Sequence, residues 1–456
     1  MLALLDLQNH RKSLAISLIA VLTFTFLCVG GNVFAVNAAV DDGDWAMFRH
    51  DLAHSGLSSS NAPNTNNTIW SYYTGYAYTT AVGSVSVGAI FSSPTIVGGR
   101  VYVLSEDCKL YCLNAESGAL IWSYETDAAY EGSSSPAVVE GKVYIGSTDD
   151  NVYCLDAESG ELIWKYKTGF EINSSPAVSD NKVYIGSEDR KVYCLDASTG
   201  ALIWNYSTVS WVDSSPAVVA GKVYVGTDLL YKGPTGGGDV YCLNAATGEY
   251  IWSYHIGYDI KSSPAVADGK VYIGSSALYS SSGTSGGSIY CLDAATGEFI
   301  WSYKTGDAVK SSPAVVDGKV YVGSSDDKVY CLNAASGNEI WSYTTDGSVS
   351  ASPTVADDKV YIESDNKGKF YCLDATSGAE IWSYQISGSS SATVADGKLY
   401  VGSDDHNVYC FGLSTLPSTL GAPMEFALTA ALLAIVIIVV GIVAAILVIR
   451  RRKKHP

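Results

Sequence analysis

One phrase recurs through most of the chain, and it restricts the folds that the chain can adopt. Residues 153–166 read YCLDAESGELIWKY, close variants of the whole phrase occur at six other places, and its IW ending alone occurs once more at Trp70. Successive copies lie 40 to 52 residues apart, measured between the tryptophans Trp70, Trp122, Trp164, Trp204, Trp252, Trp301, Trp341 and Trp382. A repeat of about 40 to 45 residues that is built from short strands is typical of the blades of a β-propeller.

Each copy of the repeat contains four strand-like pieces. Between residues 174 and 206 these pieces are SSPAV, KVYIGS, KVYCLD and ALIWNY, and turn-forming residues separate them. The alternation within the pieces places apolar or aromatic side chains on both faces of a sheet, so neighbouring sheets must cover both faces. The sequence therefore predicts an all-β fold, an eight-bladed β-propeller over residues 69–412, in which the repeated tryptophans are structural.

The order of the pieces predicts how the ring closes. The first IW piece, Ile69 to Tyr72, precedes the first SSP piece, and no IW piece follows Tyr409 and Cys410. We therefore expect the N-terminal piece to supply the outer strand of the last blade, which would join the two ends of the repeat region in one sheet.

The N-terminal region is typical of a secretory signal. Residues 1–39 carry three basic residues, His10, Arg11 and Lys12, then a long apolar run and a stretch of small residues. Cleavage near Ala39 is the prediction, and an uncleaved anchor is the alternative. Residues 40–68 then form an N-terminal lead-in segment.

The C-terminal region predicts a membrane anchor. Residues 426–449 are uncharged and almost wholly apolar, and as a helix they would exceed the hydrocarbon thickness of about 30 Å. A linker, 413–425, precedes them, and the tail, 450–456, begins with RRRKK, which marks the cytoplasmic side. We expect a single-pass protein of the cell membrane, with the propeller extracytoplasmic and the C-terminus cytoplasmic.

The balance of charge excludes some partners. The chain has 46 acidic against 28 basic residues, a net charge of −18. Nucleic acid and anionic lipid surfaces are poor partners for such a chain.

The turn before each tryptophan carries a family resemblance. The pattern A-x-[ST]-G-x-x-[IFL]-W, seen in AESGELIW and AATGEFIW, resembles the tryptophan-docking repeat of the pyrroloquinoline quinone (PQQ) enzyme-like propellers. The resemblance spans about Trp45 to Leu413, and DWAMFRHDLAHSG looks like the segment that precedes such repeats. It implies either a quinone-dependent alcohol or sugar dehydrogenase, or a non-enzymatic member such as the propeller lipoprotein of the outer-membrane β-barrel assembly machinery, which holds other proteins.

Two departures from the pattern of the dehydrogenases favour the non-enzymatic members. The dehydrogenases commonly carry two adjacent cysteines beside the quinone, and the sequence contains neither a Cys-Cys pair nor a C-x-x-C-H haem motif. We therefore expect no cofactor, with PQQ and calcium required only under the dehydrogenase alternative.

Eight of the ten cysteines occupy one repeat position. In an eightfold ring, equivalent positions of adjacent blades would lie about 11 Å apart, which is too far for a disulfide. Buried free thiols are therefore predicted. Cys108 breaks the pattern, and Cys112 is the partner considered for a bridge to it.

Other motifs give weaker signals. His50 and His54 are four residues apart but lack a third ligand, so no metal site is predicted. The sequons at Asn66, Asn173 and Asn205 make glycan attachment chemically possible on an exported surface.

The deviations from the repeat are where function is expected. Insertions at 227–239 and 275–288 and the long connection 75–91 should all protrude from one face. That face also gathers aromatic side chains, and the ligand-binding candidates among them are Phe170, Trp211, Tyr258, Tyr130, Tyr231 and Tyr279.

Polar residues near the mouth of the channel complete this prediction. Three positions before the SSP prolines the chain places Asn173, Asp213, Lys261 and Lys310, where other blades have Ser or Phe. Polar groups beside aromatic side chains suit a protein or polysaccharide ligand. Under the dehydrogenase alternative the same residues would line a quinone pocket, with Asp213 as a base or metal ligand. A structural component of the cell envelope is the third reading, in which glycine-rich insertions drift and aromatic side chains fill gaps.

Overall fold

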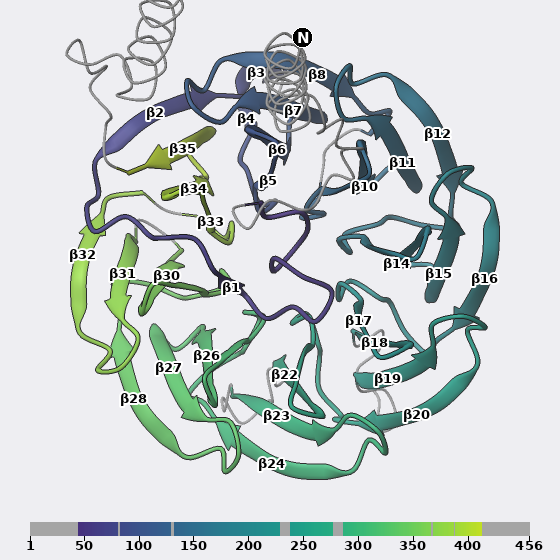
Figure 1. The fold of residues 1–456 in the computed structure, drawn as a ribbon, viewed down its shortest axis with the longest axis vertical. Coiled ribbons are helices and arrows are strands. Elements are labelled where there is room, and N and C mark those ends of the chain that lie inside the picture. Colours follow the sequence, from purple (N-terminus) through teal and green to yellow (C-terminus); the bar gives the residue numbers. More distant parts are fainter. Residues whose placement is uncertain are drawn as a thin grey trace, which may run out of the picture.

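The structure, a computed structural model, describes residues 44–80, 83–128, 132–228, 238–276, 286–365, 368–386 and 388–412. It shows eight sheets arranged radially around an axis, with the outermost strands forming the circumference (Figure 1). The predicted eight-bladed propeller is therefore confirmed. The predicted signal, linker, membrane span and tail lie outside the described residues. Among the described residues, no helix is long and apolar enough to cross a membrane.

The first four sheets follow one another in the chain, and in each the strands run from the axis outward. The first sheet has β5 (Thr95–Val97), β6 (Arg100–Ser105), β7 (Lys109–Asn114) and β8 (Leu120–Glu125). The second has β9 (Ala137–Val139), β10 (Lys142–Gly146), β11 (Asn151–Asp156) and β12 (Leu162–Lys167). The third has β13 (Ala177–Ser179), β14 (Lys182–Ser187), β15 (Lys191–Asp196) and β16 (Leu202–Ser207). The fourth has β17 (Ala217–Val219), β18 (Lys222–Gly226), β19 (Asp239–Asn244) and β20 (Tyr250–His255).

The next three sheets repeat the same order. The fifth has β21 (Ala265–Ala267), β22 (Lys270–Ser276), β23 (Gly287–Asp293) and β24 (Phe299–Lys304). The sixth has β25 (Ala314–Val316), β26 (Lys319–Ser324), β27 (Lys328–Asn333) and β28 (Glu339–Thr344). The seventh has β29 (Thr354–Ala356), β30 (Lys359–Glu363), β31 (Phe370–Asp374) and β32 (Glu380–Tyr384), with the short β1 (Leu57–Ser58) added parallel to β29.

The eighth sheet is built from both ends of the described chain. It contains β33 (Thr393–Ala395), β34 (Lys398–Gly402) and β35 (Asn407–Phe411), and its outer strand is β2 (Thr68–Tyr73). β2 pairs antiparallel with β35, so that Trp70 lies opposite Cys410 and Tyr72 opposite Val408. The predicted closure of the ring is confirmed.

The repeated tryptophan docks each sheet onto the next. Trp164 Nε1 donates a hydrogen bond to the carbonyl of Ala197 in the following sheet (3.1 Å), and the hydroxyl of Tyr144 donates to the same oxygen (3.0 Å). Gly200 ends that alanine turn with φ +72°, and a Cβ there would lie 2.7 Å from the indole of Trp164. The turn therefore needs glycine both for its backbone conformation and for the close ring contact.

Seven of the eight tryptophans make this bond, and Trp382 does not. The eighth sheet has no alanine turn after β35, so the Nε1 of Trp382 is buried without a partner, and its ring packs on Phe370 and Phe411 instead. The hydroxyl of Tyr361 bonds to the carbonyl of Pro63 in the lead-in segment. The closing sheet thus uses different contacts to perform the same docking.

The two serines of SSP explain why that motif repeats. The first serine serves its own sheet, since the amide of Gly186 donates to Ser174 Oγ (3.1 Å). The second links neighbouring sheets, since the amide of Ser175 donates to Ser215 Oγ (2.9 Å). Seven such links between sheets, of 2.8 to 3.1 Å, run from Ser93 to Ser391 around the axis.

The lead-in segment is part of the ring. From Trp45 to Ser58 it crosses the axis on one face and bonds in turn to the innermost strands, beginning at Ile96 and ending at Val394 (Figure 1). Buried Met47 packs against Val178 in the third sheet, whose innermost strand has no backbone hydrogen bond with the segment. We call this side of the ring the plugged face.

The cysteines of the described chain are buried free thiols, as predicted. Cys108 and Cys112 form no disulfide with each other, so the bridge considered between them is wrong. Cys108 lies in a tight turn with φ 66°, while the side chain of Cys112 is fully buried in the sheet. The turn and the strand thus hold the two thiols in separate environments.

Candidate functional site

The connections between sheets gather on the face opposite the plug. In every blade the link from the outermost strand to the next innermost strand lies on the same side as the turn between the second and third strands. We call this side the loop-bearing face. The first of these links carries an additional hairpin of β3 (Tyr76–Thr80) and β4 (Gly83–Val87). The two predicted insertions fall largely at 229–237 and 277–285, outside the described residues.

A polar cavity lies at the channel mouth on this face. Its volume is about 130 Å³, and every blade contributes one residue three positions before its SSP proline or the equivalent alanine. Serines from the SSP motifs lie beneath, and Phe48 of the lead-in segment lines the cavity from the plugged side. The eight mouth residues are Phe91, Ser133, Asn173, Asp213, Lys261, Lys310, Ser350 and Ser389. The four polar candidates from the sequence therefore share one cavity.

The plug closes the other end with two buried basic side chains. Arg49 is 1% exposed, and its guanidinium donates to the carbonyls of Pro353 and Pro313, the latter at 3.1 Å. His54 Nδ1 lies 2.9 Å from the carbonyl of Pro264, and burial lowers the pKa of His54 to about 4. Since a carbonyl can only accept, the neutral imidazole must carry its proton on Nδ1.

Carboxyl groups crowd one sector of the mouth. Lys261 Nζ lies 3.7 Å from Asp228 Oδ2, and Asp228 is 3% exposed. Burial and the neighbouring carboxylate of Asp213 raise the pKa of Asp228 to about 9, and burial also raises the pKa of Asp213. Burial lowers the pKa of Lys261, but the surrounding carboxylates outweigh burial and raise it overall. At neutral pH, therefore, Asp213 and Asp228 share one proton, and the neighbouring Lys261 is charged.

Asn173 extends this polar sector. Its Nδ2 donates to Glu188 Oε1 at 2.9 Å. Burial, together with the carboxylate of Asp213, raises the pKa of Glu188 to about 7. The amide of Asn173 is thus engaged inside the channel mouth, which makes this sequon a poor position for a glycan.

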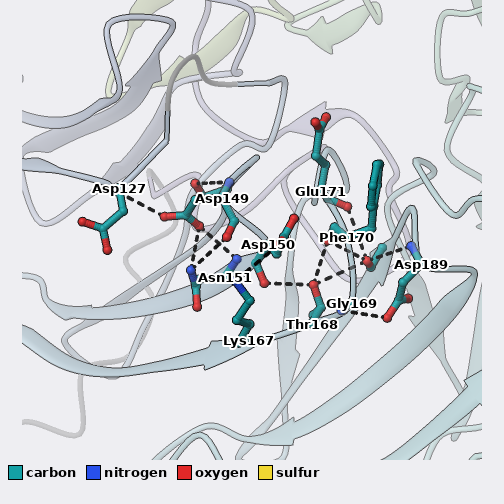
Figure 2. A network of polar contacts seen from close by, with 12 residues as sticks. Asp127, Asp149, Asp150, Asn151, Lys167, Thr168, Gly169, Phe170, Glu171 and Asp189 are labelled. Atoms are coloured by element: carbon teal, nitrogen blue, oxygen red, sulfur yellow. Dashed lines mark hydrogen bonds and ion pairs between the residues drawn. The ribbon is translucent and has the colours of Figure 1, made fainter.

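Aromatic side chains lie beside the same sector. Phe170 is 46% exposed and Tyr258 is 43% exposed, while Trp211 is half-buried. Thr168 Oγ1 donates to the carbonyl of Phe170 (2.8 Å), and the amide of Gly169 donates to Asp189 Oδ2 (2.9 Å). Figure 2 shows this network beneath the ring of Phe170, which stands clear of it. The backbone is therefore anchored while the ring remains exposed.

Three of the predicted aromatic residues cannot be placed. Tyr130, Tyr231 and Tyr279 lie outside the described residues. The structure brings Phe170, Trp211 and Tyr258 onto the loop-bearing face, in the links that lead to the third, fourth and fifth sheets.

No metal centre emerges from the part of the chain that the structure describes. There, no group of three or more His, Cys, Asp or Glu side chains is placed to hold a metal ion. His50 and His54 do not act together, because the His54 ring bonds to Pro264.

The channel mouth is a poor match for a pyrroloquinoline quinone. Pockets that enclose a drug-sized ligand have volumes of about 300–1,000 Å³, and this cavity has about 130 Å³. We therefore derive no chemical step through the quinone.

Sequence reasoning missed several residues of the site. Glu188 and Asp228 reach it from turns at the ends of the second strands, and Phe48 reaches it from the lead-in segment. No periodic signal marks these three. The sequence does show DWAMFRHDLAHSG as a segment that precedes the repeats. Its position across the end of the channel, however, depends on hydrogen bonds to carbonyls far away in sequence.

The structure has eight sheets around a polar channel mouth, and seven of the eight contacts between sheets use a tryptophan, a glycine and an alanine carbonyl. This arrangement defines a tryptophan-docking β-propeller. The family model described as outer membrane protein assembly factor BamB matches residues 55–169, 148–233, 225–284 and 285–415. Because these matches extend over more than half of the chain, the chain belongs to this family.

Solved structures share the fold at low sequence identity. BamB from Moraxella catarrhalis is 19% identical with a TM-score of 0.60, and the match covers 76% of this chain and 100% of that chain. A quinohemoprotein alcohol dehydrogenase from Comamonas testosteroni is 16% identical with a TM-score of 0.67, covering 85% and 83%. A europium-containing methanol dehydrogenase is 16% identical with a TM-score of 0.65, covering 82% and 98%. A comparison with curated proteins finds no match.

Proposed function

We propose that the chain is a membrane-anchored, extracytoplasmic propeller that binds a protein or polysaccharide partner through its loop-bearing face. The observation that carries this proposal is the polar channel mouth, closed below by the lead-in segment and flanked by exposed aromatic side chains. The membrane anchor rests on the apolar residues 426–449 and the basic tail that follows them.

The size of the cavity favours a partner that rests on the face and inserts one group. A volume of about 130 Å³ accommodates a side chain or a terminal group, but it does not enclose a whole ligand. Phe170 and Tyr258 offer flat apolar surface at the rim, which suits the centre of an interface. The lysines and carboxyl groups of the mouth would then set orientation and specificity.

The likeness to BamB supports a protein partner, since the matched family model is described as an assembly factor. The dehydrogenase alternative has support only from the shared fold of the quinoproteins, and fold alone does not determine function. A structural component of the envelope without a specific ligand is the remaining alternative.

The proposal can be tested by removing the exposed rings. A variant with Phe170→Ala and Tyr258→Ala should keep the wild-type melting temperature, because both rings are largely exposed. It should lose at least tenfold in affinity for partners that are captured by crosslinking on intact cells, since a buried aromatic anchor contributes about 2 kcal/mol or more.

A matched control replaces exposed apolar residues away from this face. Leu162→Ala and Ile163→Ala change side chains that are 43% and 44% exposed on β12, at the outer circumference. If the control and the test variant lose the same partners, or neither loses any, the loop-bearing face is not the binding site.

A further inference from the structure

One seam between sheets differs from the others in what fills it. In six blades the second strand carries a glycine at or close to its end, and the next connection places a fully buried Ile or Val against it. A Cβ on Gly186, for example, would lie 2.5 Å from Val212 Cγ1. The six pairs are Gly146 with Ile172, Gly186 with Val212, Gly226 with Ile260, Gly274 with Val309, Gly323 with Val349, and Gly402 with Ile90.

The seam between the seventh and eighth sheets reverses this pair. There β30 ends in Glu363, and the corresponding residue of the next connection is Gly388. A Cβ on Gly388 would lie 3.2 Å from both carboxyl oxygens of Glu363. A carboxyl group therefore occupies the space that an aliphatic side chain fills at six other seams, and the glycine opposite makes room for it.

Filling this space does not require a carboxyl group. At the seam after the first sheet the residue of the second strand equivalent to Glu363 is Leu104, 1% exposed, and the residue equivalent to Gly388 is Gly132. The position equivalent to Glu363 is thus filled there by a buried apolar side chain, so the carboxyl group at 363 needs its own explanation.

Glu363 lies in this seam without a partner among the residues that the structure describes. It is 1% exposed, and neither of its oxygens makes a hydrogen bond to them. Three carboxyl groups raise the pKa of Glu363 through their charge: Asp365, which follows β30, and Asp404 and Asp405, which lie on the turn before β35. Glu106 of the first sheet in turn raises the pKa of Asp404. Two basic groups lie near these carboxyl groups. His406 lowers the pKa of Glu106 and Asp404, and Lys310 lowers the pKa of Asp365. Tyr409 is the remaining ionisable neighbour, and the charge of Glu363 raises its pKa.

A buried carboxyl group can be neutralised by a cation, a metal ion or a proton. Within the described ranges no Lys, Arg or His forms an ion pair with Glu363, and no three metal-ligating side chains converge. Among the described residues, the surroundings of Glu363 therefore favour neutralisation by a proton.

We propose that Glu363 is a proton-operated latch, which carries a proton when the seventh and eighth sheets are closed and weakens their seam when it ionises. Burial first, and then the carboxylates of Asp404, Asp365 and Asp405, raise the pKa of Glu363 well above its usual value. The stabilising contribution is present below the unfolded pKa of about 4.5 and is lost as pH rises towards the folded pKa. The latch thus holds in acid and loosens towards alkaline pH.

The seam lies next to the sheet that closes the ring, so weakening it would affect both the closure and the channel mouth. The eighth sheet is the one that β2 and β35 close, and its contact with the seventh lacks the tryptophan hydrogen bond, since Trp382 Nε1 has no partner. Loosening it would separate sheets at the rim of the channel mouth, where Ser350 and Ser389 line the cavity.

The test is the pH dependence of unfolding of the full-length protein and two variants. Glu363→Leu recreates the Leu104 seam, and Glu363→Gly with Gly388→Val recreates the six others. Between pH 5 and pH 8 the unfolding equilibrium constant of the wild type should rise by up to about tenfold per pH unit more than that of either variant. Both variants should melt at higher temperature than the wild type at pH 8.

The design remains decisive if one variant fails to fold, because the double replacement uses a pair that already packs at six seams. Equal pH dependence in the wild type and in a folded variant would overturn the latch. So would a rise in the wild-type melting temperature with calcium at pH 8 that the variants lack, because an ion rather than a proton would then neutralise Glu363.

Discussion

At the plugged face the channel is sealed by side chains that bond to backbone carbonyls, whereas at the loop-bearing face it is lined by side chains that bond to one another. Arg49 and His54 bond to proline carbonyls, and seven of the eight blades carry this proline. Asn173, Asp213 and Lys261, in contrast, occupy one position of the repeat with different chemistry in each blade. The same eight strands thus carry a conformational seal at one end and a chemically varied surface at the other.

The largest expected effect tests whether the side chains of the plug contribute more to the free energy of unfolding than the side chains of the channel mouth. Arg49→Met would leave the carbonyls of Pro313 and Pro353 unpaired in the interior, and each unpaired group costs about 1–3 kcal/mol. We expect a loss of about 3 kcal/mol in the free energy of unfolding, measured by urea denaturation. The matched change at the other end, Lys310→Met, should stay within about 0.5 kcal/mol, because Lys310 is exposed. Comparable losses at the two ends would break the comparison.

The second prediction concerns the loss of stability at acid pH that His54 of the plug should cause. His54 has its pKa lowered to about 4 by burial, so its neutral form stabilises the fold above the unfolded pKa of about 6.5, and this contribution is lost as pH falls towards 4. Between pH 7.5 and pH 4.5, His54→Gln should lose about 2–3 kcal/mol less than the wild type, since glutamine cannot gain a proton there. Parallel pH profiles of the two proteins would show that His54 does not titrate in the plug.

The smallest effect has the opposite sign and lies at the mouth. Burial and Asp213 raise the pKa of Glu188 to about 7, so the protonated form stabilises the fold below about pH 4.5, and this contribution is lost as pH rises to 7. Glu188→Gln should therefore be more stable than the wild type at pH 8, by about 1 kcal/mol because the group is partly exposed. At pH 4.5 the two should agree. A variant that is less stable at pH 8 would show that the ionised carboxylate supports the mouth.

Much of the plan of the ring could be predicted from the sequence because it depends on local periodicity. Strand alternation and the glycine turn recur in every copy, and the displaced Ile69–Tyr72 piece showed which strand closes the last sheet. The four polar candidates near the mouth share one cavity because they occupy the same position in consecutive repeats.

The remainder depends on contacts between residues far apart in the chain. The bond from Arg49 to Pro353 joins residues 304 positions apart, and no local pattern encodes it. The pairing of Glu363 with Gly388 becomes visible only when both are compared with the equivalent residues of other seams. The bridge considered for Cys108 was wrong because proximity in sequence does not show how a tight turn directs a side chain.

The shared sheet of β2 and β35 has a consequence for how the chain can be made. Trp70 and its partner Cys410 are separated by nearly the whole repeat region, so a ribosome must deliver all eight copies before the circle can be completed. Until then β2 has no partner strand, and a product that ends before β35 would leave a gap in the circle and an unpaired strand at each side of it. Such intermediates expose edges on which chains aggregate. Synthesis of β33, β34 and β35 is therefore the step that allows an aggregation-prone open arc of sheets to close into a ring.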